Sequence, residues 1–150
     1  MEQNVIISIR GDQDFEETGK DTTEFMTEGT LSTTNYGYLL EYDESELTGM
    51  EGTHTAFQIR PKSVALVRTG AFKSQMIFED GKKHYSLYKT PYGPLTLDII
   101  TSYLHTDFTE NSGAMEIRYA IEIDHQVTGE SCFKVKVRPK TEGAPQQSKE

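Results

Sequence analysis

Residues 76–97 read MIFEDGKKHYSLYKTPYGPLTL, and two turn signals interrupt their alternation of large and polar side chains. The first signal is Asp80-Gly81, which is typical of a two-residue hairpin turn. Such a turn needs positive φ at its central positions, which Gly adopts freely and Asp tolerates. The pair therefore predicts a hairpin that joins residues 74–79 to residues 82–90.

The second signal is Thr90-Pro91-Tyr92-Gly93. Pro suits the φ of about −65° that a type I turn needs, and Gly suits the left-handed position that follows. Residues 82–90 should therefore turn directly into residues 94–103. Two further reversals are expected at Glu110-Asn111-Ser112-Gly113 and at residues 124–129. The strands would then form an antiparallel meander, whose two edges stay bare unless the sheet closes on itself.

Alternation with a period of two extends from this stretch over almost the whole chain, which predicts strands with one buried and one wet face. In AMEIRYAIEID (residues 114–124) the apolar face is Met115, Ile117, Tyr119, Ile121 and Ile123. In SCFKVKVR (residues 131–138) it is Phe133, Val135 and Val137. In YGYLLEYDE (residues 36–44) the sequence favours a face made of Tyr38, Leu40 and Tyr42.

About ten such segments and no convincing long helix predict an all-β fold. We expect an antiparallel meander that closes into a β-barrel of about eight to ten strands, because no helices are present to cover the sheet. Residues 1–138 would form this single domain. Residues 139–150, PKTEGAPQQSKE, are mostly polar and are expected to be a disordered tail.

The composition restricts the classes of partner. Twenty-four acidic and fifteen basic residues among 150 give a net charge of −9, which disfavours nucleic acid and anionic membranes as partners. Cys132 is the single cysteine, which excludes an intramolecular disulfide and fits a reducing compartment. The start of the sequence has no signal-peptide pattern, and no run of eighteen apolar residues occurs. We interpret the chain as a cytoplasmic protein.

Three segments carry a family resemblance: LTGMEGTHT (residues 47–55), GAFKSQMIFEDGKKHYSLYKTPYGPLTLDIIT (residues 70–101) and YAIEID (residues 119–124). With these segments the chain resembles the YwiB-like family of small bacterial proteins, a domain of unknown function. The similarity runs from about Glu24 to Arg138. It implies a calycin-like β-barrel, related in architecture to lipocalins and fatty-acid-binding proteins, and it brings no established activity with it.

The chain departs from those better-known barrels in features that carry their function. Lipocalins have a Gly-x-Trp near the first strand, and this sequence contains no Trp. Fatty-acid-binding proteins have a helical pair after the first strand, for which residues 11–22 are too short and too polar. Their carboxylate-binding Arg-x-Tyr is also absent here, since Arg118 and Tyr119 are adjacent and point to opposite faces. A fatty-acid function is therefore not carried over.

Arg68 is a candidate for binding a ligand. It lies near the end of SVALVRTG (residues 63–70), on the same face as Val64 and Leu66, so the alternation turns its guanidinium toward the mouth of the barrel. A guanidinium there needs a carboxylate or an anionic ligand, and Glu51 is one candidate partner at the rim. The alternative is that Arg68 extends into solvent at a wet strand end.

Tyrosine and histidine supply the other candidate ligand contacts. His84 and Tyr88 share one face of KHYSLYKT, and Tyr119 belongs to the apolar face of its strand. If the first two face inward, they need each other, water or a ligand as partners; if they face outward, Tyr85 and Leu87 fill the core. Tyr92 is a further rim candidate, because a turn does not require an aromatic ring.

Catalytic and metal sites are not indicated. Cys132 has no recognisable base nearby, and its alternation places it on the solvent face with two lysines. His54, His84, His105 and His125 lack ligand spacing. A phosphate-binding loop and a nucleophile elbow are absent from the sequence. We therefore expect no catalytic residues, no cofactor and no metal.

Two functions remain open. The first is a non-enzymatic module that binds a small amphipathic or apolar molecule through Arg68, His84, Tyr88 and Tyr119. The second is a packed barrel that acts through its outer surface, as a protein-interaction or homo-oligomer module. Apolar residues on the expected outer faces, namely Leu39, Ile77 and Ile100, motivate the second.

Overall fold

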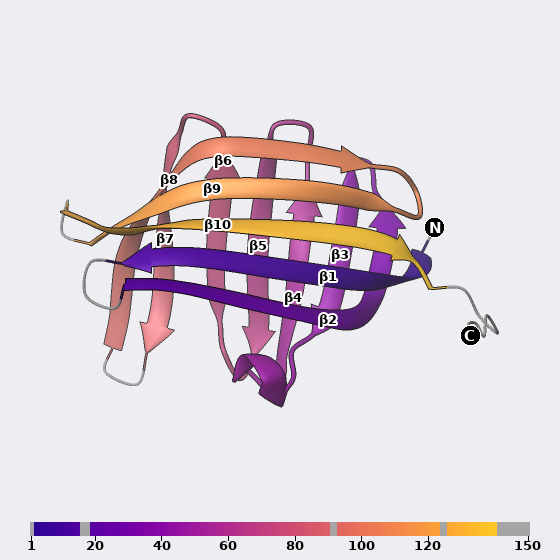
Figure 1. The fold of residues 1–150 in the computed structure, drawn as a ribbon, viewed down its shortest axis with the longest axis horizontal. Helices are drawn as coiled ribbons and strands as arrows, with labels where there is room; N and C mark the ends of the chain where they lie inside the picture. Colours follow the sequence, from indigo (N-terminus) through magenta and orange to yellow (C-terminus); the bar gives the residue numbers. More distant parts are fainter. Residues whose placement is uncertain (1, 16–18, 91–92, 124–125, 141–150) are drawn as a thin grey trace.

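The computed structural model describes residues 2–15, 19–90, 93–123 and 126–140, with the side chains of all but residues 87–90 and 95. These residues form ten strands and one short 3-10 helix, η1 (Figure 1). The elements in chain order are β1 Glu2–Phe15, β2 Gly19–Thr33, β3 Tyr38–Asp43, η1 Glu46–Thr48, β4 Thr53–Ile59, β5 Ser63–Gly70, β6 Ser74–Glu79, β7 Lys83–Thr90, β8 Gly93–Phe108, β9 Gly113–Ile123 and β10 Gln126–Pro139. The predicted all-β fold is confirmed.

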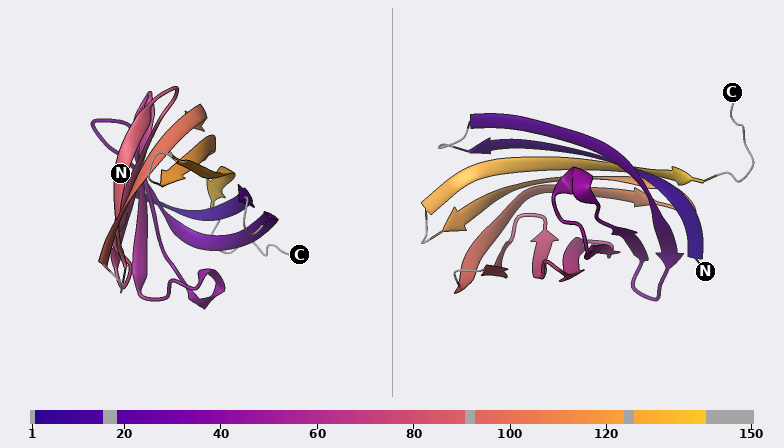
Figure 2. Two further views of the ribbon diagram at one scale, coloured as in Figure 1. Left: turned by 90° about the vertical axis from the view of Figure 1, so that its left-hand side faces the viewer. Right: turned by 90° about the horizontal axis from the view of Figure 1, so that it is seen from below.

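All ten strands belong to one antiparallel sheet, in the order β6-β5-β4-β3-β2-β1-β10-β9-β8-β7. The first and last strands of the chain are neighbours, and β1 pairs with β10 from Val5↔Pro139 to Phe15↔Gly129. The sheet curls round so that its edges, β6 and β7, lie next to each other (Figures 1 and 2). The result is a nearly closed barrel, as the meander predicts.

The hairpin predicted between residues 74–79 and 82–90 is wrong in its pairing, although its turn forms. Lys82 N–H donates to the carbonyl of Glu79 at 2.9 Å, and Gly81 has a φ of 74°. The next backbone groups bond to β8 instead: Gly81 N–H donates to Thr101 O, and Thr101 N–H donates to Lys82 O. Within the described residues no backbone ladder joins β6 to β7. The turn therefore connects the two edge strands of the sheet, β6 and β7, without pairing them.

Side chains connect those edges. Ser86 Oγ on β7 donates to the carbonyl of Gln75 on β6. His84 Nε2 lies 3.0 Å from Glu79 Oε1, at the end where the turn is. Because these contacts replace a ladder, the barrel is held shut at this seam by few polar interactions.

The barrel has a front and a back layer of strands in Figure 1, and two strands, β2 and β8, belong to both layers and form its corners. Figure 1 shows β9, β10 and β1 running across the front, with β3 to β7 running behind them in the other direction. β2 pairs with β1 and then, at Thr30↔Glu41, begins to pair with β3. β8 pairs with β7 over its first half and with β9 over its second, with a register shift between Thr101 and Tyr103. Bends and bulges are the usual means by which a strand changes layer.

The interior is filled with side chains over most of its length. Four aromatic rings join the layers: Phe57 and Phe78 come from the back, and Tyr119 and Phe133 come from the front. The Phe78 and Tyr119 rings lie 4.9 Å apart, and Phe78 meets Phe133 edge-on at 5.6 Å. Such contacts between rings stabilise the fold in addition to the burial of the rings' apolar surface.

The C-terminal boundary of the barrel lies slightly beyond the predicted one. β10 continues to Pro139, and Lys140 N–H donates to the carbonyl of Asn4 at 3.0 Å. Residues 141–150, which carry most of the predicted tail, lie outside the described residues. Among the residues described, no helix is long and apolar enough to cross a membrane.

Candidate functional site

A cavity of about 350 Å³ opens at one end of the barrel and lies between the two layers. Its lining is mixed, and it includes three of the four aromatic residues that join the layers, namely Phe57, Tyr119 and Phe133. The apolar lining consists mainly of Ile9, Phe25, Phe57, Leu66, Met76, Ile121 and Phe133. The polar lining includes Gln13, Tyr42, Glu44, Thr48, Arg68, Tyr119 and Ser131.

The strongest polar interaction in the lining is built round Glu44. Its side chain is fully buried, directly after β3. Thr55 Oγ1 donates to Oε2, and Thr48 Oγ1 donates to Oε1 at 2.9 Å. Arg68 Nε lies 3.7 Å from Oε2, and the Arg68 side chain is 18% exposed. The carboxylate is therefore fixed by two hydroxyl groups and faces the guanidinium as a partly buried ion pair.

A row of polar side chains, here called the rear row, crosses the back layer at this level. It consists of Tyr42, Thr55, Arg68 and Ser74, which are successive cross-strand partners on β3, β4, β5 and β6. Residues paired in this way carry their side chains on the same face of a sheet. Burial, followed by the negative charge of Glu44, raises the pKa of Tyr42, so its hydroxyl keeps its proton at neutral pH.

A second row, here called the front row, lies in the opposite layer. It consists of Gln13, Ser131, Tyr119 and Thr101, which are cross-strand partners on β1, β10, β9 and β8. Ser131 is 7% exposed and Thr101 is 1% exposed. The cavity thus lies between two polar rows, with aromatic rings beside them.

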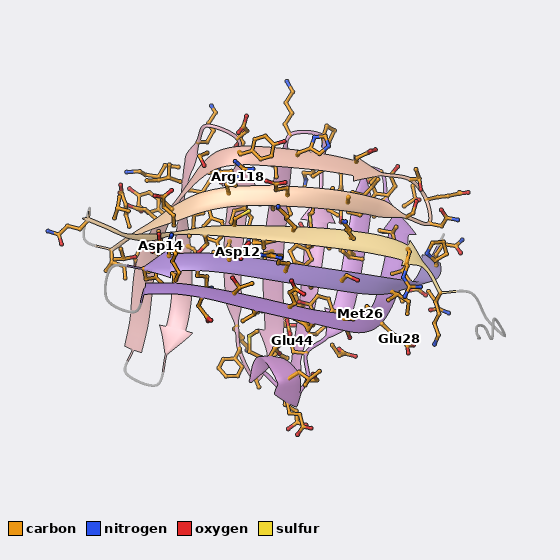
Figure 3. The ribbon with its side chains drawn as sticks, in the orientation of Figure 1. Asp12, Asp14, Met26, Glu28, Glu44 and Arg118 are labelled. Carbon is orange, nitrogen blue, oxygen red and sulfur yellow. The ribbon has the colours of Figure 1, made fainter. Side chains whose placement is uncertain are left out.

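The loop around η1 contributes two residues to the lining of the cavity. Ser45 caps η1 by accepting from Leu47 N–H at 3.2 Å, and Thr48 and Met50 line the cavity. Figure 3 shows Glu44 at the lower end of the back layer, directly beside η1. The hydroxyl of Thr48 therefore links this loop to the carboxylate that faces Arg68.

The structure brings two of the predicted ligand-binding residues together. Arg68 and Tyr119 both line the cavity, one from each layer. The partner of Arg68 is Glu44, whereas Glu51 is exposed in the turn before β4. Glu51, which the sequence offered as one candidate partner, is not the carboxylate that faces Arg68, and a signal for Glu44 was present in the sequence. Continuing the Leu40 and Tyr42 face by two residues reaches Glu44.

The other predicted contacts are not placed at the cavity. His84 is paired with Glu79 at the seam and is not among the described residues that line the cavity. The side chain of Tyr88 and the whole of Tyr92 lie outside the described residues. Sequence reasoning missed Ser131 and Gln13, although the inward face of Phe133 and Val135 also includes Ser131.

Outside the cavity, His54 lies on the outer face of the back layer between two carboxylates. Its Nδ1 is 2.8 Å from Asp43 Oδ1, and its Nε2 is 3.1 Å from Glu41 Oε1. The two ring nitrogens thus contact different carboxylates. Within the described part of the chain, no group of three or more His, Cys, Asp or Glu side chains is arranged to hold a metal ion. The hydrogen bond to Asp43, then that to Glu41, raises the pKa of His54.

This arrangement makes a prediction about pH. A raised folded-state pKa stabilises the fold below the unfolded value of about 6.5, and the contribution is lost as the pH rises through the folded-state pKa. We expect His54→Gln to be destabilised by less than about 1 kcal/mol at pH 5.5, with the difference closing by pH 8.5, since the pair is exposed. Urea unfolding at both pH values measures this. An unchanged difference in the Asp43→Asn background would contradict the assignment to Asp43.

The three apolar residues that the alternation places on the outer faces are only partly exposed. Leu39, Ile77 and Ile100 are all partly buried. Cys132 lies between Asp12 on β1 and Arg118 on β9, and Figure 3 shows both charged residues over the front layer. The cavity is therefore the described feature that brings two of the candidate residues, Arg68 and Tyr119, together.

Comparisons with known proteins agree with this architecture. A domain of unknown function, DUF1934, matches residues 7–135. The uncharacterized beta-barrel protein YwiB of Bacillus subtilis (strain 168) is 27% identical over 125 residues, which are 82% of this chain and 86% of YwiB. The crystal structure of ywiB protein from Bacillus subtilis superposes with a TM-score of 0.82 at 20% identity, and covers 93% of this chain and 94% of that one. The resemblance to the YwiB-like family is confirmed, and the chain belongs to the DUF1934 family of β-barrel proteins of unknown function.

Proposed function

We propose that the barrel is a small-ligand-binding module that holds one small amphipathic molecule in the cavity between the rear and front rows. The observation that carries this proposal is at Arg68, which lines the cavity and whose buried Nε has no hydrogen-bond partner among the described residues. The carboxylate oxygen Glu44 Oε2 lies 3.7 Å from this Nε, beyond hydrogen-bond distance. A donor buried in this way costs free energy unless something accepts its proton. A bound molecule with an acceptor atom would supply that partner.

The size and chemistry of the cavity support the same function. Its volume of about 350 Å³ lies at the lower end of the range for small-molecule sites, which is about 300–1,000 Å³. Sites of this kind combine apolar and aromatic walls with a few polar groups that orient the ligand. The rings of Phe57 and Phe133 would contact an apolar body, and Arg68 and Ser131 would orient a polar group.

Native mass spectrometry of the gently purified protein tests the proposal. We expect a discrete excess mass that denaturation releases. Ser131→Phe should abolish it by placing a ring in the cavity, whereas Cys132→Phe, one residue along on the outer face, should retain it. Circular dichroism checks that both variants fold. A wild-type protein without excess mass, which also fails to bind added naphthalene-2-carboxamide, would refute the proposal.

Several expectations from the sequence remain predictions. A calycin-like relationship and a cytoplasmic location rest on the family resemblance and on the single cysteine. A homo-oligomer or protein-interaction role would use the outer row Leu39, Gln58, Ala65 and Ile77, which crosses β3 to β6. The partial burial of Leu39 and Ile77 leaves this row with little apolar area to offer, so the cavity is the better-supported site.

A further inference from the structure

The unpaired polar atoms of the interior gather in the two rows that flank the cavity. Among the described residues, four buried side-chain atoms have no hydrogen-bond partner: Arg68 Nε, Ser74 Oγ, Thr101 Oγ1 and Ser131 Oγ. Two belong to the rear row and two to the front row. Arg68 and Ser131 line the cavity directly, and Ser131 is more than nine-tenths buried. Two of the four unpaired atoms therefore belong to residues that line this one cavity.

The two unpaired groups that line the cavity can both donate a proton. The Nε of Arg68 is a donor only, and the hydroxyl of Ser131 can donate or accept. The residues that carry them line the same cavity from opposite layers, on β5 and β10. A molecule between them would satisfy both by presenting acceptor atoms, such as the oxygen of a carbonyl group.

The charge at the site selects among acceptor-bearing molecules. The guanidinium of Arg68 already faces the carboxylate of Glu44 at 3.7 Å, so the pair is neutral overall. The Glu44 side chain is fully buried, where water screens charge weakly. A ligand carboxylate at Arg68 would share one positive charge with Glu44, and two nearby carboxylates repel each other strongly in such surroundings. A neutral acceptor would avoid this cost.

We infer that the cavity selects a neutral amphipathic molecule, whose carbonyl-type oxygen accepts from Arg68 and Ser131 while its apolar body contacts the aromatic wall. Amides, esters and ketones belong to this class, and simple carboxylates do not. The inference rests on the proposed function and adds the charge and polar group of the ligand. Glu44 is the specificity-determining residue for this selection, because its negative charge balances the positive charge of Arg68 before a ligand binds.

A matched pair of probes tests the selection. Naphthalene-2-carboxamide and naphthalene-2-carboxylate have nearly the same shape and differ in charge. Calorimetric titration of the wild-type protein is expected to give at least about tenfold tighter binding of the carboxamide, which corresponds to about 1.4 kcal/mol. Naphthalene fluorescence gives a second readout, because the protein has no Trp to interfere.

Variants separate the roles of the residues. Glu44→Gln leaves the guanidinium without its carboxylate, so the preference should reverse and the carboxylate should bind more tightly. Ser131→Ala should weaken carboxamide binding about threefold to tenfold by removing one donor, whereas Cys132→Ala on the outer face should leave it unchanged. Thermal unfolding of each variant confirms that it is folded at the temperature of the titration.

The outcomes distinguish the two proposals. Tighter binding of the carboxamide with reversal in Glu44→Gln supports the inference. Equal or tighter binding of the carboxylate to the wild-type protein overturns the neutral-ligand inference and leaves the binding function standing. Failure of both probes to bind, together with the absence of a releasable mass in native mass spectrometry, overturns both.

Discussion

Gly29→Ala is expected to lower the free energy of unfolding by about 3 kcal/mol or more, which is at the upper end for overpacking a well-packed site. A β-carbon at this position would lie 2.3 Å from the carbonyl oxygen of Glu41 and 2.6 Å from Cδ1 of Ile7. The first contact is with backbone, so a change of side-chain rotamer cannot relieve it. Glu41 pairs with Thr30, the next residue of β2. Relief would therefore require β2 and β3 to move apart.

Gly11→Ala provides the matched control in the same pair of strands. Its β-carbon would meet only Thr23 Oγ1, at 3.3 Å, and that hydroxyl can rotate. We expect a change within about 1 kcal/mol, as for substitutions away from the core. Urea unfolding of both variants at pH 7 measures the difference. Equal destabilisation by the two substitutions would contradict the close approach assigned to Gly29.

This glycine matters because of where β2 changes layer. β2 pairs with β1 along most of its length and begins to pair with β3 at Thr30. A strand that turns from one layer into the other brings backbone close to backbone at the inside of the bend. At the other corner, β8 uses a register shift between Thr101 and Tyr103 to change layer.

The strands and most turns could be predicted from the sequence because they depend on neighbouring residues. Alternation over AMEIRYAIEID correctly places Met115 and Ile117 in the core. The Asp80-Gly81 turn also forms, but its hairpin does not. The backbone of residues 81 and 82 is bound by Thr101, about twenty positions along the chain. The residues of the turn itself do not indicate that a distant strand competes for these backbone hydrogen bonds.

The candidate site could be predicted only in part, for a related reason. Alternation indicates the face of a strand, and Arg68, which it places on the face of Val64 and Leu66, lines the cavity. The same rule, applied two residues beyond Tyr42, would have identified Glu44, which directly follows β3. Whether a cavity remains between the layers depends on the volumes of side chains from at least six strands, including Phe57, Ile121 and Phe133. No periodicity within one strand contains that information.

Arg68→Met is expected to destabilise the protein by about 2–3 kcal/mol at neutral pH. Removing one member of a buried ion pair costs about 3–5 kcal/mol, because the remaining charge is left without a partner. The cost should be lower here, since Arg68 is 18% exposed and lies 3.7 Å from Glu44. Arg118→Met is the control: its pair with Glu116 is exposed, so its loss should cost less than about 1 kcal/mol.

The double variant Glu44→Gln with Arg68→Met separates the charge from the packing. The amide oxygen of a Gln at position 44 can accept from one of the two threonine hydroxyls, its NH2 group can donate to the other, and no unpaired charge remains. We expect the double variant to lie within about 1 kcal/mol of the wild-type protein, so the two substitutions should be strongly non-additive. Urea unfolding of the wild type, both single variants and the double variant completes the cycle. Additive losses would show that Glu44 and Arg68 stabilise the barrel independently, and the neutral pair on which ligand selection depends would then lose its basis.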